Sequence, residues 1–233
     1  MFPKSLLTAL LLTLIPFVAF AQGKIERPSS SNKVSSTTGV LNGHQYIDLE
    51  LPSGTKWSTC NIGTDKFDYY GNLFVWGNPE VVTDDGWTKR PSYYEQSSFA
   101  GLQEYDPATA IWGKKWQTPT MDDFNELIDN CIFTWTDDYD GGVWVQSKRN
   151  GQKIYLPACG GCSGTQGYDY IGIVGLYWTA SSAPTETTYG DKVKDFAFCF
   201  QFMTSDTKSI APTIRTNPRQ ACLSIRPILK NND

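Results

Sequence analysis

The chain has 233 residues, of which 40% are hydrophobic, 14% are aromatic and 19% are charged, and its formal net charge is −4. This length is sufficient to bury a sizeable core within one domain. The acidic balance and the lack of a Lys/Arg cluster in the sequence argue against nucleic acid or an anionic membrane surface as a partner, and we expect neither.

Residues 1–21 have the pattern of a secretory signal peptide. Lys4 supplies a positive charge, an apolar run covers residues 6–20, and a small-x-small site ends the segment. A membrane anchor is the alternative, but Pro16 interrupts the run, and a span needs about 20 apolar residues. We therefore expect this segment to be removed, the polar residues 22–38 to form a flexible leader, and the mature chain not to insert into a membrane.

The first expected elements of the domain are short strands. Residues 44–51 alternate between polar and apolar side chains, a period of two that predicts a strand. Further strands are expected at residues 57–62 and 73–76. Residues 77–107 show no periodicity, and we interpret them as an ordered surface loop or, alternatively, as a loop that contacts a ligand.

One helix is predicted strongly, at residues 121–131. Thr120 is a suitable N-cap, and Asp122 and Asp123 place negative charge beside the unpaired N–H groups of the first turn. A shorter helix is expected within residues 106–112. The apolar stripe of the main helix consists of Phe124, Leu127, Ile128 and Cys131.

After the main helix the chain is expected to return to short strands. The dipeptide Asn150-Gly151 is a tight-turn signal within a predicted meander. In residues 195–203 four phenylalanines alternate with other residues, which predicts a central strand with one face in the core. The strands expected in this half are residues 132–135, 143–147, 153–157, 175–180, 195–203 and 222–229.

Several blocks of the sequence occur in an order that resembles a known family. They include NLFVWG, GLYWTASS and SIRPI, and they cover residues 42–63, 72–77, 108–136, 154–160, 175–182 and 224–228. In this order they resemble the Fibrobacter succinogenes major paralogous domain type of exported Bacteroidetes proteins. That domain is related to the C-type-lectin-like and formylglycine-generating-enzyme-like folds.

The resemblance covers residues 40–229 and implies the architecture. We expect a single domain at residues 39–230 with an α+β, C-type-lectin-like fold. Such a fold has small antiparallel sheets, one strong helix, a second short helix and long loops that form a binding face. Because this scaffold carries lectins, receptors and an oxidase-like enzyme, the fold alone does not determine the function.

The sequence contains few residues that could hold a metal or start a reaction. It lacks the tripeptides that bind calcium in C-type lectins, and the acidic run at residues 137–141 lacks two essential ligands of a calcium loop. His44 is the only histidine and is interpreted as a structural residue, which argues against zinc and against Ser-His-Asp or Cys-His catalysis. We therefore expect no metal, no cofactor and no catalytic residue.

All six cysteines follow the expected signal peptide, and cysteines of exported proteins are most often structural disulfides. The alternative is a redox pair, for which the Cys-x-x-Cys spacing of Cys159 and Cys162 is suited. The sequence leaves the pairing open, and our interpretation joins Cys199 to Cys222, Cys159 to Cys162, and Cys60 to Cys131.

Aromatic recognition is the function that we favour from the sequence. Tyr and Arg in the late loops suit a ligand-binding surface because they supply rigid contacts and fork-shaped donors. We interpret the chain as an exported, calcium-independent domain that binds an extracellular glycan or protein ligand. The alternatives are an oxidase-like enzyme that uses a cysteine pair and a structural subunit of a surface assembly. The candidate ligand-binding residues are Tyr168, Tyr170, Tyr177, Tyr189, Lys194, Arg215 and Arg219.

Overall fold

The computed structural model describes residues 37–83, 97–162, 170–183, 187–188, 191–192, 196–205 and 210–230. The chain divides into residues 1–35 and residues 36–233, and every described residue belongs to the second unit. The expected signal peptide and nearly all of the expected leader lie outside the described residues. So do three candidate ligand-binding residues, Tyr168, Tyr189 and Lys194.

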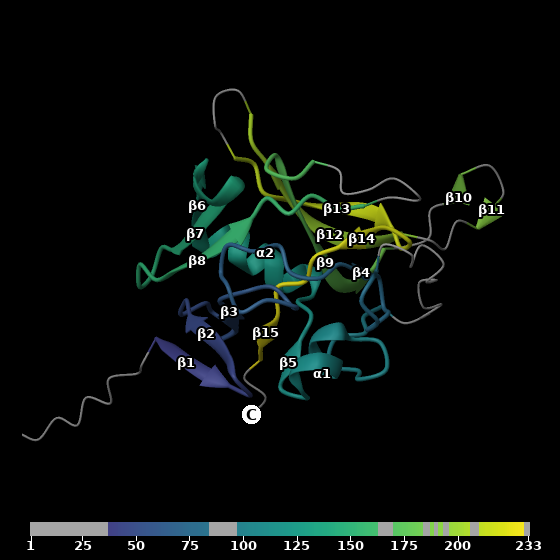
Figure 1. Cartoon of the computed structure of the whole chain (residues 1–233), viewed down its shortest axis with the longest axis horizontal. Coiled ribbons are helices and arrows are strands. Elements are labelled where there is room, and N and C mark those ends of the chain that lie inside the picture. The colour runs from purple at the N-terminus through teal and green to yellow at the C-terminus, as the bar shows by residue number, and fades with distance from the viewer. Residues whose placement is uncertain are drawn as a thin grey trace, which may run out of the picture. The chain divides into compact units, whose positions relative to one another are not determined.

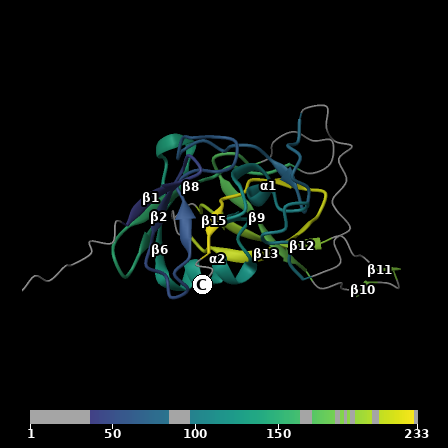
Figure 2. The same cartoon turned by 90° about the horizontal axis from the view of Figure 1, so that it is seen from below.

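The described residues form an α+β arrangement of small antiparallel sheets with two α-helices (Figure 1). The largest sheet has five short strands in the order β1-β2-β3-β15-β5, so the last described strand lies between β3 and β5 from the first half of the chain (Figure 1). Figure 2 shows β1, β2 and β15 of this sheet from below. The strands of this sheet are β1 (Thr38–Leu41), β2 (His44–Asp48), β3 (Lys56–Ser58), β5 (Trp116–Gln117) and β15 (Ile228–Leu229).

The first two predicted strands are shorter in the structure than the sequence pattern suggests. β2 ends at Asp48, and Glu50 has a φ of 50°, a left-handed conformation that interrupts extended backbone. β3 ends at Ser58, whose N–H donates to Pro227 O at 2.9 Å. The apolar residues that follow each strand therefore lie in turns, and their side chains still enter the core.

Both helices begin where the neighbouring residues supply capping groups. α1 (Pro107–Trp112) has Asp106 as its N-cap, and the Asp106 carboxylate accepts a hydrogen bond from the N–H of Ala108. α2 (Met121–Asn130) begins with a capping box in which Thr120 and Asp123 each accept from the N–H of the other. The predicted main helix is confirmed, except that Cys131 already begins the next strand.

α2 packs on the middle strand of a second sheet, which has the order β13-β12-β9 (Figure 1). The ring of Phe124 stacks on the ring of Phe200 at 4.5 Å and tilts against Trp57 at 5.0 Å. The predicted central strand is therefore confirmed. The strands are β9 (Val174–Ser182), β12 (Phe196–Met203) and β13 (Thr213–Pro218).

The phenylalanines of β12 do not all enter the core, and the pairing of this strand is regular with β13 but irregular with β9. The register against β9 shifts between Ala197 and Cys199, which is a β-bulge. Phe200 and Phe202 are completely buried, whereas Phe196 is 36% exposed. The expectation of one core face with four phenylalanines is wrong for Phe196, and Phe198 is only half-buried. Phe200 and Phe202 enter the core because this end of the strand packs in the same buried cluster as Phe124 and Leu127 of α2.

The predicted meander is confirmed as a third sheet in the order β6-β7-β8. Its strands are β6 (Cys131–Thr136), β7 (Gly142–Ser147) and β8 (Lys153–Pro157), and a 3-10 turn at Asp138–Asp140 lies between the first two. Two further pairs complete the described strands: β4 (Phe74–Val75) with β14 (Cys222–Leu223), and β10 (Thr187–Thr188) with β11 (Asp191–Lys192).

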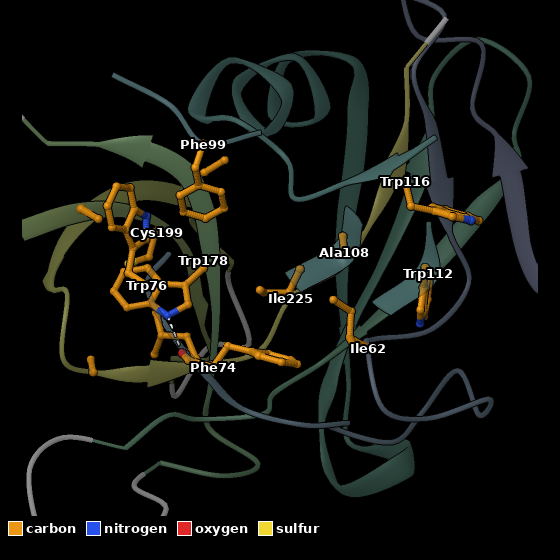
Figure 3. Close-up of a cluster of buried hydrophobic side chains, with 14 of the residues drawn as sticks. Ile62, Phe74, Trp76, Phe99, Ala108, Trp112, Trp116, Trp178, Cys199 and Ile225 are labelled. Carbon is orange, nitrogen blue, oxygen red and sulfur yellow. Dashed lines mark hydrogen bonds between the residues drawn. The ribbon is translucent and has the colours of Figure 1, made fainter. Parts of the chain in front are cut away.

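Tryptophans form much of one buried cluster (Figure 3). Trp76 and Trp178 lie beside Phe74, and their indole N–H groups donate to Thr179 O at 2.9 Å and Phe74 O at 2.8 Å, respectively. Because both indoles are buried and hydrogen-bonded, they stabilise the core without leaving an unpaired polar atom.

Arg226 connects the C-terminal segment to the turn after β3. Its side chain is completely buried, its Nε donates to Asn61 Oδ1 at 2.7 Å, and its Nη1 donates to Ser58 O at 3.2 Å and to Thr59 O at 2.9 Å. Hydrogen bonds to carbonyl and amide oxygens thus replace part of the water that a guanidinium normally holds, whereas Nη2 is buried with no hydrogen-bond partner among the described residues. This contact positions the chain immediately before β15.

Candidate functional site

An open pocket of about 490 Å³ lies beside the third sheet. One wall is the chain after β3, with Asp65, Phe67 and Asp68, and the other is formed by Trp144 of β7 and Tyr155 of β8. This volume lies within the range of small-molecule binding pockets, which are mostly apolar with a few polar groups. The pocket is therefore a candidate binding site.

The aromatic rings of the pocket come together because of strand pairing. Trp144 pairs directly with Tyr155 in the antiparallel ladder, so both side chains project from the same face of the sheet, with ring centroids 5.2 Å apart. The neighbours Val143 and Val145 are completely buried on the opposite face. Phe67 approaches from the loop, at 5.7 Å from Tyr155 and 6.0 Å from Trp144.

The rings differ in their exposure, and this difference shapes the pocket. Tyr155 is only 1% exposed, Phe67 is 37% exposed, and Tyr139, which contacts both of these rings, is 46% exposed. Tyr155 therefore forms the floor and Phe67 presents surface to a ligand, whereas Tyr139 is not part of the pocket lining and packs against both rings. Gly142 permits this arrangement, because a Cβ atom there would lie within collision distance of the Tyr155 hydroxyl.

Tyr155 is held as a neutral phenol. Its hydroxyl donates to Asp138 O at 3.2 Å. Burial is the main cause that raises the pKa of Tyr155, and the nearby groups Tyr70 and Asp68 raise it further. The floor of the pocket thus carries no charge at any physiological pH.

Charged side chains of both signs surround the aromatic surface. Lys153 Nζ lies 4.1 Å from the centroid of the Trp144 ring, a cation–π contact, and Lys66 Nζ donates to the Tyr69 hydroxyl at 3.2 Å. Asp65 and Asp68 line the same pocket. The rim therefore offers both donors and acceptors without a dominant net charge.

The ionisable residues that line the pocket are two aspartates, two lysines and a tyrosine. Its lining contains neither histidine nor cysteine. Within the part of the chain that the structure describes, no group of three His, Cys, Asp or Glu residues could hold a metal ion. His44, the one histidine, lies elsewhere, with its ring stacked on Trp112 at a centroid distance of 3.7 Å.

The structure separates the candidate residues of the late loops. Tyr170 is 65% exposed, and Arg215 is exposed on β13. Arg219 lies over the Trp76 ring at 4.1 Å, and its Nε donates to Phe196 O at 3.2 Å, so it is engaged in packing. Tyr177 is completely buried and its hydroxyl donates to Pro157 O at 2.7 Å, which corrects the expectation that it contacts a ligand.

The structure joins none of the expected cysteine pairs. All six cysteines are buried and described, and no disulfide joins them. Each expected pair combines residues from two different buried clusters. The clusters contain Cys60 with Cys199, Cys131 with Cys159, and Cys162 with Cys222.

No sequence pattern marked the pocket residues Phe67, Trp144, Lys153 and Tyr155 as site residues. One signal was available for Trp144, because it stands between two valines of a predicted strand and must face away from the core. Nothing local indicates that Phe67 lies over the same face.

No family model, no curated protein and no solved structure matches the chain. None of the helices in the described ranges has the length and apolar character that a membrane-spanning helix requires.

Proposed function

We propose that this protein is an exported domain with a C-type-lectin-like fold that binds a neutral carbohydrate, without calcium, in the pocket of Phe67, Trp144 and Tyr155. The observation that carries the proposal is the cluster of partly exposed aromatic rings beside a mixed polar rim. The signal-peptide pattern and the blocks that resemble the Fibrobacter succinogenes major paralogous domain support export and the fold assignment.

Carbohydrates combine an apolar C–H face with a ring of hydroxyl groups. The faces of Phe67 and Trp144 carry the negative part of the aromatic quadrupole, which attracts the weakly positive C–H hydrogens of a sugar. Lys66 and Lys153 can donate to hydroxyl oxygens, and Asp65 and Asp68 can accept from hydroxyl hydrogens. Because these charges balance, the pocket favours a neutral sugar over an anionic one.

The cysteines do not favour the alternative of an oxidase-like enzyme. Burial raises the pKa of Cys131 and of Cys199 to about 11 and also raises the pKa of Cys159. A reactive cysteine requires a lowered pKa and partial exposure, because the thiolate is the nucleophile. These three thiols have the properties of structural residues.

The proposal is tested with a panel of neutral oligosaccharides and the protein purified after export, by isothermal titration calorimetry. We expect a bound sugar whose affinity falls roughly tenfold or more in Trp144→Ala and in Phe67→Ala, because central aromatic contacts contribute about 1–3 kcal/mol. Lys153→Gln should weaken binding about threefold, since the lysine lies at the exposed rim. The affinity should be the same with and without EDTA.

Tyr170→Ala is the matched control, because this exposed tyrosine does not line the pocket. We expect it to leave the affinity unchanged, and all variants should keep the melting temperature within a few degrees. A loss of binding in Tyr170→Ala but not in Trp144→Ala would place the site in the late loops. Binding of protein ligands but of no sugar on the panel would contradict the carbohydrate assignment.

A further inference from the structure

Cys162 and Cys222 lie opposite each other across an antiparallel bridge. The N–H of Cys162 donates to Cys222 O at 3.0 Å, and the N–H of Cys222 donates to Cys162 O at 2.9 Å. In such a reciprocal pair the Cα atoms are about 5.5 Å apart and the two side chains project from the same face. This separation is close to the one most common in disulfide-bonded pairs.

The surroundings of the two thiols are apolar and closed. Cys162 is 7% exposed and Cys222 is 2% exposed, and they form a buried cluster with Leu73 and Val75. A hydrogen bond with the Cys162 thiol is the largest cause that raises the pKa of Cys222, ahead of burial. The two sulfur atoms therefore face each other within this cluster.

We propose that Cys162 and Cys222 form an intramolecular disulfide when the protein meets a small-molecule disulfide such as oxidised glutathione. Because both thiols are closed off in the folded protein, the exchange takes place when this segment opens locally. The thiolate of Cys162, the more exposed residue, then attacks one sulfur of glutathione disulfide and releases one glutathione thiolate. The Cys222 thiolate then attacks the Cys162 sulfur of the mixed disulfide and releases the second glutathione. Two protein thiols are oxidised, and one glutathione disulfide is reduced to two thiols that take up the two protons.

The geometry requires only a small closure. In a hydrogen-bonded pair the Cβ atoms lie near the upper end of about 4.5–5.5 Å, against about 3.5–4.5 Å in a disulfide, so the strands must approach by about 1–2 Å. The bond would fasten residues 160–162 to β14, whose partner strand is β4. It closes the loop that contains all of β9, β12 and β13.

The other four cysteines lack such an opposed partner. Cys159 Sγ donates to Leu176 O at 3.4 Å, and Cys199 accepts from Asn217 Nδ2 at 3.6 Å. Each of these thiols is thus engaged with a neighbour that is not a cysteine. Cys60 and Cys131 lie in two different buried clusters. We therefore expect one disulfide and four thiols.

The test uses the full chain, incubated with oxidised glutathione, acid-quenched and labelled with a maleimide in denaturant. We expect two of the six thiols to be lost, and a tryptic map without reductant to link residues 154–192 to residues 220–230. Because Cys159 and Cys162 share one tryptic peptide, Cys159→Ser separates them: the link should persist in Cys159→Ser and in the control Cys199→Ser, and disappear in Cys162→Ser.

Stability provides an independent measurement. The melting temperature of the oxidised wild-type protein should exceed that of the reduced protein by about 10 °C, because the bond constrains a long loop of the unfolded chain. In Cys222→Ser, oxidation should no longer raise the melting temperature. If that variant does not fold, the peptide map of the oxidised wild-type protein tests whether the disulfide forms. Six labelled thiols after oxidation, or a link through Cys159 or Cys199, would overturn the proposal. Neither cysteine lines the aromatic pocket, so this result is separable from sugar binding.

Discussion

His44 carries the only imidazole of the chain, and its ring lies flat against Trp112 with a centroid distance of 3.7 Å. Burial lowers the pKa of His44 below its usual value of 6.5. The unfolded chain therefore binds more protons than the folded protein in the interval between the two pKa values. The free energy of unfolding must decrease as the pH falls from about 6.5 through the folded-state pKa.

The variant His44→Phe keeps the aromatic stack but cannot titrate. The wild-type protein should lose stability relative to this variant as the pH falls from about 7 to 5, as measured by urea unfolding at each pH. Carboxylates titrate in both proteins, so the difference isolates His44. An NMR titration that gives His44 a pKa above 6.5, as a cation–π contact with Trp112 would, contradicts the prediction.

At the scale of the element, α2 depends on its capping box. The Asp123 carboxylate accepts from the Thr120 N–H at 2.8 Å, and Lys230 Nζ lies 2.7 Å from its other oxygen. Thr120→Ala should lower the free energy of unfolding by about 1 kcal/mol, because the N–H of Asp123 loses its acceptor. Asp122 lies in the same turn but is exposed, and Asp122→Ala should cost only a few tenths of a kcal/mol. Thermal denaturation measures both variants. An equal loss of stability in Thr120→Ala and Asp122→Ala would show that charge in the first turn, and not the cap, stabilises the helix.

At the scale of the whole domain, β15 joins segments that are far apart in the chain. Ile228 pairs with Trp57 of β3 on one side and with Gln117 of β5 on the other, and it is completely buried. Ile228→Ala should therefore cost about 2–5 kcal/mol and destabilise all elements together. The control Ile132→Ala, at a 53% exposed position of β6, should cost less than about 0.5 kcal/mol.

Far-ultraviolet and near-ultraviolet circular dichroism measure this cooperativity. In Ile228→Ala the secondary and tertiary signals should still be lost in one coincident transition, at a lower temperature than in the wild-type protein. Separate transitions would mean that the sheet containing β15 unfolds independently of the rest of the domain.

The sequence by itself determined the elements whose signals lie within a few residues. Pro119, Thr120 and Asp123 define the start of α2, and the Asn150-Gly151 turn joins β7 to β8. Such signals are readable because capping and tight turns involve residues that are close along the chain. The outward position of Trp144 can also be predicted locally, because the residue stands between two valines of one strand.

Only the tertiary structure decided where those elements meet. Tyr177 resembles a surface aromatic in sequence but is completely buried, and Arg226 is buried although arginine is normally exposed. The approach of Phe67 to Trp144 and the opposition of Cys162 and Cys222 depend on the packing and register of distant segments. A shift of one residue turns every side chain of a strand to its other face, so local patterns cannot specify these contacts.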